Sequence, residues 1–282
     1  MANNLINQFF ERSKSKRWSE GTKRTYRESL DAFDKFLTER KKGLATFEQS
    51  DVTDYLNSLG GEASTLRRHS TPLKRLYRYS KGIDLDLSDV LPSASSSRIP
   101  AWLNIDEIKK LVKQSNNPLE TIIQLTYDGA LRISETLGLD ISDIDFEHSL
   151  IRLHEAKRKE EQIVKLRMTG TMGRLKDYIG SRDKGYLFID EKGNSISRFW
   201  VYNELKRVAK EILGDNRAKI VHPHILRHSR LTHLALTKKM DINELKAFAR
   251  HSDIRTTALY IHIAATILDE SGEKAQRDIG DW

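Results

Sequence analysis

The chain of 282 residues contains no cysteine at all. Disulfide bonds, thiolate nucleophiles, cysteine-ligated zinc sites and iron–sulfur clusters are therefore excluded. Glycine is also sparse, with 15 residues, and no glycine-rich phosphate-binding loop occurs. The candidate reactive groups of this chain are therefore arginine, lysine, histidine, tyrosine and carboxylate side chains.

Long apolar runs are missing as well. No stretch of about 18 apolar residues is present, so we expect no transmembrane helix and no membrane partner. The first ten residues lack the apolar stretch of a signal peptide, and the absence of cysteine fits a reducing compartment, so we expect a cytoplasmic protein. The composition, 38% hydrophobic and 31% charged, is typical of a folded protein. The formal net charge of +8 suggests a polyanionic partner.

One segment separates the chain into two parts. Between Pro92 and Pro100 a cluster of serines shows no apolar periodicity, which is typical of a flexible connector. We predict a helical domain over residues 1–93, a linker over residues 94–100 and a second domain over residues 101–282.

Apolar side chains in the first part recur at spacings of three and four residues, which predicts four helices packed as a small bundle. Thr22 is the predicted N-cap of the second helix, and Gly82 ends the fourth. Basic residues line the polar faces of the second and fourth helices. Those predicted to contact a polyanion are Lys23, Arg24, Arg27, Arg67, Arg68, Lys74 and Arg75. The alternative is a solvated surface that binds nothing.

The second part combines helices with one β-hairpin. Alternating apolar residues predict strands over residues 150–153 and 163–166, joined by a charged segment. Asn104 is the predicted N-cap of the first helix. The predicted helices cover residues 105–113, 118–131, 133–139, 199–213, 225–236, 242–249 and 256–267. The expected fold class is therefore mainly α with a small antiparallel β-sheet in the second domain.

A cluster of histidines stands out in the second part: His222, His224 and His228 lie within seven residues, together with Arg227. His224 and Arg227 share one face of a helix start, because they are three residues apart. Cations at a helix N-terminus face the unfavourable end of its dipole, which makes sense if an anion binds there. A zinc site and purely structural histidines are the alternatives. No carboxylate lies within residues 221–238, which disfavours a hydrolytic metal site.

Three other segments carry candidate reactive side chains. Arg132 stands at a turn between two apolar helices, where Glu135 is an available structural partner. Lys157 lies at the tip of the predicted hairpin, and His251 precedes Tyr260 by nine residues. Each segment by itself has a plainer interpretation: a structural ion pair, a solvated lysine and a core aromatic residue.

In this order and spacing, the segments resemble the tyrosine recombinase/integrase family, and most nearly its Xer-type recombinases of bacteria and archaea. The resemblance covers nearly the whole chain. Ala130-Leu-Arg132-Ile-Ser-Glu135 is similar to the family's Gly-Leu-Arg-x-Ser-Glu stretch. The other matching residues are Lys157 in the hairpin turn, His224 and Arg227 of the His-x-x-Arg box, His251 of the Gly-His segment, and Tyr260. Alanine or arginine replaces a family glycine at positions 130, 156, 158 and 250, and Lys159 is the alternative to Lys157.

The resemblance implies a site-specific DNA recombinase that needs no metal, no other cofactor and no ATP. Tyr260 would be the nucleophile that forms a covalent 3′-phosphotyrosine. The other implied roles are charge stabilisation by Arg132, Arg227 and His251, protonation of the leaving 5′-oxygen by Lys157, proton acceptance by His224, and orientation of the arginine by Glu135.

The implied partners are a double-stranded DNA recombination site and further copies of the chain, as a dimer on each site and a tetramer at synapsis. The two domains would close around the duplex, and the tail over residues 267–282 would pass to a neighbouring protomer, with a frayed terminus as the alternative. Chromosome dimer resolution is the expected role. Mobile-element integration, type IB topoisomerase-like relaxation and a DNA-binding accessory protein with a lapsed active site are the alternatives.

Overall fold

The computed structural model describes residues 3–12, 18–60, 62–91, 100–154, 161–237 and 240–271. The chain divides into two compact units, Met1–Ser97 and Arg98–Trp282, and each is described by itself. The predicted linker, apart from Pro100, and the part of the predicted tail beyond Ser271 lie outside the described residues. Within the described ranges, no helix combines the length and the apolar character that crossing a membrane requires.

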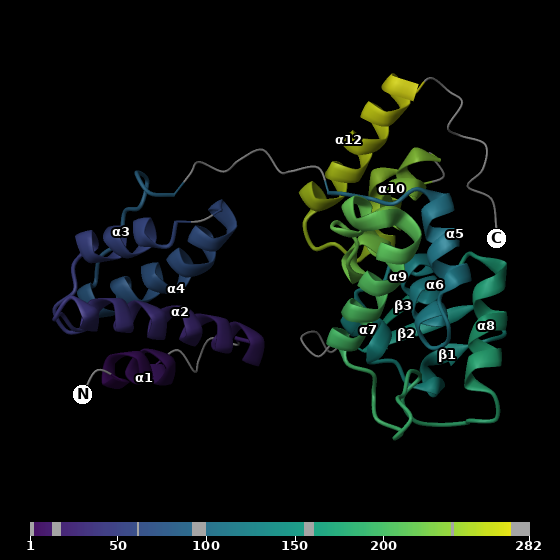
Figure 1. Ribbon diagram of the computed structural model, residues 1–282, viewed down its shortest axis with the longest axis horizontal. Coiled ribbons are helices and arrows are strands. Elements are labelled where there is room, and N and C mark those ends of the chain that lie inside the picture. The colour runs from purple at the N-terminus through teal and green to yellow at the C-terminus, as the bar shows by residue number, and fades with distance from the viewer. Residues whose placement is uncertain are drawn as a thin grey trace. The chain divides into compact units, whose positions relative to one another are not determined.

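The described part of the first unit is a bundle of helices (Figure 1). They are α1 (Asn3–Arg12), α2 (Glu20–Glu39), α3 (Gln49–Ser58) and α4 (Ala63–Lys81). The apolar stripes that predict these helices face one another, as amphipathic helices require. The core of the bundle includes Leu30, Phe33 and Leu37 of α2, Val52 and Leu56 of α3, and Leu73 and Leu76 of α4.

The ends of these helices follow local capping chemistry. The N-cap of α2 is Ser19 and not the predicted Thr22, because the Ser19 hydroxyl accepts a hydrogen bond from the Thr22 amide at 3.2 Å. Thr22 therefore lies inside the first turn. α4 ends at Gly82 as predicted, where a φ of 77° suits a residue without a Cβ.

The second unit is mainly helical and contains one small antiparallel sheet. Its strands, in the order β1-β2-β3, are β1 (Ile144–Asp145), β2 (Leu150–His154) and β3 (Glu161–Lys165). Ile151 of β2 pairs with Val164 of β3, and both side chains are buried on one face. The predicted hairpin and the predicted fold class are thereby confirmed. The tip of the hairpin, residues 155–160, lies outside the described residues.

Helices precede and follow this sheet along the chain. They are α5 (Ile105–Gln114), α6 (Leu119–Asp128), α7 (Ile133–Leu137), the 3₁₀ turn η2 (Ile141–Asp143), α8 (Thr169–Ile179), α9 (Arg198–Ala218), α10 (Pro223–Leu236), α11 (Ile242–Ala249) and α12 (Ile254–Ser271). Asn104 caps α5 as predicted. The sequence did not predict α8, whose Gly170 and Gly173 weaken helix propensity. Packing of its buried Leu175 into the core compensates for that weakness.

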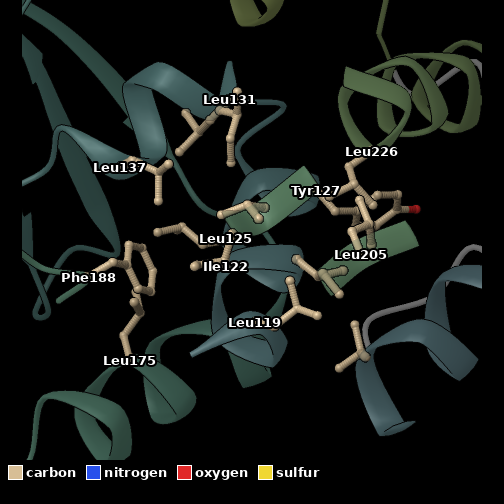
Figure 2. Close-up of a cluster of buried hydrophobic side chains, with 14 of the residues drawn as sticks. Leu119, Ile122, Leu125, Tyr127, Leu131, Leu137, Leu175, Phe188, Leu205 and Leu226 are labelled. Atoms are coloured by element: carbon tan, nitrogen blue, oxygen red, sulfur yellow. The ribbon is translucent and has the colours of Figure 1, made fainter. Parts of the chain in front are cut away.

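Helix α6 runs through the core of this unit, where its buried side chains form one cluster with Leu175 of α8, Leu205 of α9 and Leu226 of α10 (Figure 2). The predicted helix over 118–131 was too long at its end. α6 stops at Asp128, because Gly129 ends it and Ala130 takes a positive φ of 44°. This abrupt turn sets Arg132 directly at the start of α7, and α10 packs against α6, α11 and α12. The turn and these helices build the candidate site.

Candidate active site

The turn between α6 and α7 presents Arg132. Arg132 is the N-cap of α7, and its backbone amide donates to Glu135 Oε2 at 2.7 Å. Its Nη1 donates to Glu135 Oε1 at 2.5 Å. The Arg132 side chain is 37% exposed, whereas that of Glu135 is 15% exposed. The Glu135 carboxylate therefore fixes the orientation of the Arg132 guanidinium. Part of the guanidinium stays exposed, so its other N–H groups can donate to an anion.

Helix α10 supplies a second arginine. The Arg227 side chain is buried, and its two Nη atoms donate to the carbonyl oxygens of Ala130 and Ala249. Burial, followed by the nearby Arg250 and Arg132, lowers the pKa of Arg227 to about 10. The group remains a cation at neutral pH. Carbonyl oxygens satisfy its donors without carrying a formal negative charge, so the site retains an attraction for anions.

Tyr260 faces α10 from helix α12. Its hydroxyl lies 2.6 Å from Nδ1 of His228, and its side chain is almost fully buried. Burial raises the pKa of Tyr260 to about 12, although Arg227 opposes the shift. Burial, followed by His222, His224 and Arg227, lowers the pKa of His228 to about 4. At neutral pH a neutral phenol therefore lies against a neutral imidazole, which is a pair suited to proton transfer.

The two remaining histidines are neutral as well. His251 Nδ1 lies 2.9 Å from Thr257 Oγ1, which fixes its ring nearly parallel to Tyr260 with 6.1 Å between ring centroids. Burial, followed by Arg227 and Arg132, lowers the pKa of His251 to about 4. Desolvation, followed by Arg227 and Arg132, lowers the pKa of His224, which lies in the first turn of α10.

The structure thus gathers most of the predicted site residues. Glu135 binds Arg132, and the carbonyl oxygens of Ala130 and Ala249 accept from Arg227. Tyr260 comes from α12, and His251, in the segment between α11 and α12, stacks beside it. The predicted site residues that meet here are Arg132, Glu135, Arg227, His251 and Tyr260, with His224 in their electrostatic field. Lys157 and its alternative Lys159 lie outside the described residues.

Two residues of the site escaped the sequence analysis. His228, named there only as a member of the histidine cluster, contacts the Tyr260 hydroxyl, and the predicted His224 does not. Arg250, noted only as a replacement of glycine, donates to Glu135 Oε2 at 3.0 Å. The available signal for Arg250 was its place directly before His251. Over the described ranges, no group of three or more histidine, aspartate or glutamate side chains could hold a metal ion.

The basic residues predicted to bind a polyanion lie on α2 and α4 of the first unit. All seven are exposed or half-buried: Lys23, Arg24, Arg27, Arg67, Arg68, Lys74 and Arg75. The guanidinium of Arg27 lies 4.6 Å from the ring centroid of Phe10, and that of Arg75 lies 5.5 Å from that of Trp18. These contacts with aromatic rings restrict the side chains of Arg27 and Arg75 before any ligand binds.

Comparison with known proteins identifies the family. The profile of the phage integrase family matches residues 101–266, which is more than half of the chain. The chain belongs to the phage integrase family. A phage integrase N-terminal SAM-like domain also matches residues 6–81. The expectation of a tyrosine recombinase is thereby confirmed.

Individual relatives agree with this assignment. A tyrosine recombinase of Thermosipho africanus is 30% identical over 271 residues, covering 88% of this chain and 91% of the relative. The tyrosine recombinase XerA of Pyrococcus horikoshii is 28% identical over 234 residues, covering 80% of each chain. The crystal structure of the XerH site-specific recombinase bound to a palindromic difH substrate has the same fold. It aligns with a TM-score of 0.73 and 17% identity, covering 98% of this chain and 85% of XerH.

Proposed function

We propose that this tyrosine recombinase is a site-specific DNA recombinase that cuts and rejoins double-stranded DNA through a covalent 3′-phosphotyrosine at Tyr260. One observation carries the proposal: the Tyr260 hydroxyl lies 2.6 Å from the neutral imidazole of His228 and in the electrostatic field of Arg227. A phosphodiester is the anion that such a nucleophile and such a cation would recognise together.

The cleavage step exchanges one bond at phosphorus and moves two protons, one from the Tyr260 hydroxyl and one to the leaving 5′-oxygen. The Tyr260 oxygen forms the new bond to phosphorus, the bond to the 5′-oxygen breaks, and the phenolic proton passes to an imidazole. His228 is the acceptor that the hydrogen bond favours over the predicted His224. Arg132, Arg227 and His251 would hold the non-bridging oxygens as negative charge develops on them.

Rejoining is the same reaction in reverse, with a 5′-hydroxyl as the attacking group. The phosphotyrosine retains the energy of the broken bond, so the cycle needs no ATP. Lys157 is proposed as the acid that protonates the leaving 5′-oxygen, with Lys159 as the alternative, on the family resemblance alone. The Tyr260 side chain is 2% exposed, so DNA binding must also make its hydroxyl accessible.

The proposed substrate complex involves both domains. Residues 1–93 would contact one face of the duplex through the basic residues of α2 and α4, and residues 101–282 would contact the other. Phosphate contacts of this kind supply affinity and register, while base contacts select the sequence. Exchange between two sites requires a protomer at each of four cleavage positions, so we propose a dimer on each site and a tetramer at synapsis.

The biological role that we propose is chromosome dimer resolution. Support comes from the relatives named XerA and XerH, one of which was solved on a difH substrate. Mobile-element integration uses the same chemistry and is the alternative. The absence of cysteine fits a cytoplasmic location, which we propose together with this role.

The decisive experiment captures the covalent intermediate at whichever DNA sequence the protein selects. A library of duplexes with a randomised centre and a nick on one strand is incubated with the protein in chelator. Protein-linked DNA is recovered under denaturing conditions and sequenced, and mass spectrometry maps the attached nucleotide. Attachment at Tyr260 to an enriched sequence is expected. Attachment at another residue, or none, contradicts the proposal.

A second assay separates the recombinase from a topoisomerase. A supercoiled plasmid that lacks the enriched sequence should not be relaxed, and a plasmid pair that carries it should exchange strands. Relaxation of both plasmids without exchange would favour the type IB topoisomerase-like alternative, whereas binding without attachment would favour the accessory protein.

A further inference from the structure

Arg250 occupies a backbone position that favours glycine. It ends α11 in the left-handed conformation, with a φ of 56°. This conformation strains any residue with a Cβ, and glycine adopts it freely. The backbone amide of Arg250 donates to the carbonyl oxygens of Lys246 and Ala247, a role that glycine would fill equally well. The reason for an arginine at this position therefore lies in its side chain.

The Arg250 side chain reaches back to the turn between α6 and α7. It is 5% exposed, and its Nη2 donates at 3.0 Å both to the carbonyl oxygen of Ala130 and to Glu135 Oε2. Both acceptors are shared with the arginines of the site. The Ala130 carbonyl also accepts from Arg227, and Glu135 also accepts from Arg132. Arg250 thus lies behind both groups that we propose to bind phosphate.

Glu135 is the direct link from Arg250 to Arg132. Burial raises the pKa of Glu135, but the charge of Arg250 and the hydrogen bonds from Arg132 outweigh burial and hold the pKa below its ordinary value. The carboxylate therefore stays ionised at neutral pH. An ionised Glu135 accepts hydrogen bonds from both the backbone amide and the guanidinium of Arg132. Protonation of Glu135 would turn one of its carboxyl oxygens into a donor and so remove one of these acceptors.

We propose that Arg250 is a positioning residue for DNA cleavage, which holds the Arg132 guanidinium through Glu135 in the orientation that receives the phosphate. This inference rests on the function proposed above. Contact with the phosphate falls to Arg132, whose side chain is 37% exposed, while Arg250 Nη2 donates to Ala130 and Glu135 behind it. A misplacement of about 1 Å at a reacting group is enough to slow catalysis strongly.

The test replaces Arg250 by the residue that its backbone prefers. Arg250→Gly keeps the left-handed turn and removes the guanidinium, and Ser149→Gly is the matched control at another positive φ of 57° in the same unit. We expect Arg250→Gly to slow covalent attachment to the captured nicked duplex by at least about tenfold, with affinity within about threefold. Ser149→Gly should match the wild type, and Arg250→Lys, which keeps the charge without the fork, should be intermediate. Attachment by Arg250→Gly within about twofold of wild type would overturn the inference.

A double-mutant cycle with Glu135→Gln tests the route of the effect. If Arg250 acts through Glu135, the double variant should attach to DNA no more slowly than the slower single variant. Losses that multiply would show that Arg250 acts by another route, and would overturn the inference even if Arg250→Gly is slow.

The pKa of Glu135, followed by NMR of its carbon-13-labelled carboxyl group, tests the link without DNA. The charged and titratable groups that face Glu135 are Arg132, Arg227, His224 and Arg250. Removal of Arg250 should raise the pKa of Glu135. It should also move the acid limb of the cleavage profile to higher pH, which the loss of an ion pair with no part in positioning Arg132 would not do. An unchanged pKa would overturn the inference. If the wild type attaches to no DNA, the proposed function fails, and the Glu135 pKa still decides whether Arg250 controls this carboxylate.

Discussion

Helix α10 carries two histidines, five residues apart, that each share a hydrogen bond with a tyrosine hydroxyl. His228 Nδ1 lies 2.6 Å from the Tyr260 hydroxyl, and His233 Nδ1 lies 2.7 Å from the Tyr127 hydroxyl. Burial raises the pKa of both tyrosines and lowers the pKa of both histidines. Both pairs therefore hold a neutral phenol against a neutral imidazole, and only one pair belongs to the candidate active site.

The surroundings of the Tyr127–His233 pair are those of a core. The Trp102 ring meets the His233 ring edge-on, and the guanidinium of Arg230 lies 5.2 Å from the Tyr127 ring centroid. Arg230 is in turn paired with the buried Asp128 carboxylate at 3.2 Å. The cation beside this pair is thus neutralised within the fold and offers little attraction to a phosphate.

The Tyr260–His228 pair borders Arg227, whose donors end on carbonyl oxygens. Glu135 is a carboxylate of that region, and it faces three guanidinium groups, those of Arg132, Arg227 and Arg250. Positive charge is therefore left over for a substrate. The comparison teaches that a buried tyrosine–histidine hydrogen bond makes a candidate nucleophile only where nearby cations remain uncompensated.

Removing the tyrosine hydroxyl should give the largest contrast between the Tyr260–His228 pair and the Tyr127–His233 pair. Tyr260→Phe removes the proposed nucleophile while the ring still packs, so attachment to the nicked duplex should fall below detection with DNA binding retained. Tyr127→Phe should keep attachment within about threefold per folded molecule. It should instead lower the free energy of unfolding by about 1–3 kcal/mol, because buried His233 loses a partner. Denaturing gels and thermal melts measure the two effects. Covalent attachment of DNA to the Tyr260→Phe variant would show that Tyr260 is not the nucleophile.

The second largest contrast is expected between variants of the two buried arginines of α10, Arg227 in the site and Arg230 in the core. Arg227→Lys keeps a charge but loses the planar fork, so cleavage should slow by about 10²-fold, and Arg132→Lys should behave alike. Arg230→Lys is the matched control on the same helix. It should lower the melting temperature through its pairing with Asp128 and leave cleavage per folded molecule within about tenfold. Near-normal cleavage by both site variants would assign the site arginines a structural role only.

Part of this contrast is visible in the sequence and part is not. Arg132, His224, Arg227 and Tyr260 could be predicted from the sequence because their order and spacing resemble those of the tyrosine recombinase family. Their partners are hidden, since His228 lies 32 residues from Tyr260 and Arg250 lies 115 residues from Glu135 in the chain.

Local periodicity likewise fails where packing overrides propensity. The turn at Ala130, with its positive φ, ends α6 at Asp128, before the predicted helix end at Leu131. The glycine-containing α8 forms because Leu175 is buried against the core, which no local pattern reveals. Both errors lie where tertiary contacts decide the backbone. The turn before Arg132 was predicted, but the helix before it ends earlier than its apolar pattern indicates.

A moderate effect is expected at the hydroxyl that orients His251. Thr257→Val removes the partner of His251 Nδ1 with almost no change in shape, so the imidazole loses its fixed orientation beside Tyr260. Cleavage should slow by about tenfold, less than on the loss of a charged donor. Thr256→Val, at the exposed neighbouring position, is the matched control and should cleave normally. Equal rates for the two variants would show that Thr257 does not orient the ring.

The smallest effect concerns the pH dependence of stability. Burial lowers the pKa of His233 to about 3, whereas the unfolded chain binds this proton near the ordinary value of about 6.5. Below that value the unfolded state binds more protons than the folded state. The stabilisation is therefore complete above about pH 6.5 and is lost as the pH falls toward 3, by at most about 1.4 kcal/mol per pH unit.

The same sign holds for His228, whose pKa is lowered to about 4, but its half-buried ring is better screened by water. Thermal melts between pH 7 and pH 4 at constant ionic strength should show a falling melting temperature. His233→Gln should flatten that fall more than His228→Gln does, because the 2% exposed His233 is shielded on every side by the core. Equal flattening would show that the core pair and the site pair are equally screened, which would remove the difference in solvent access between them.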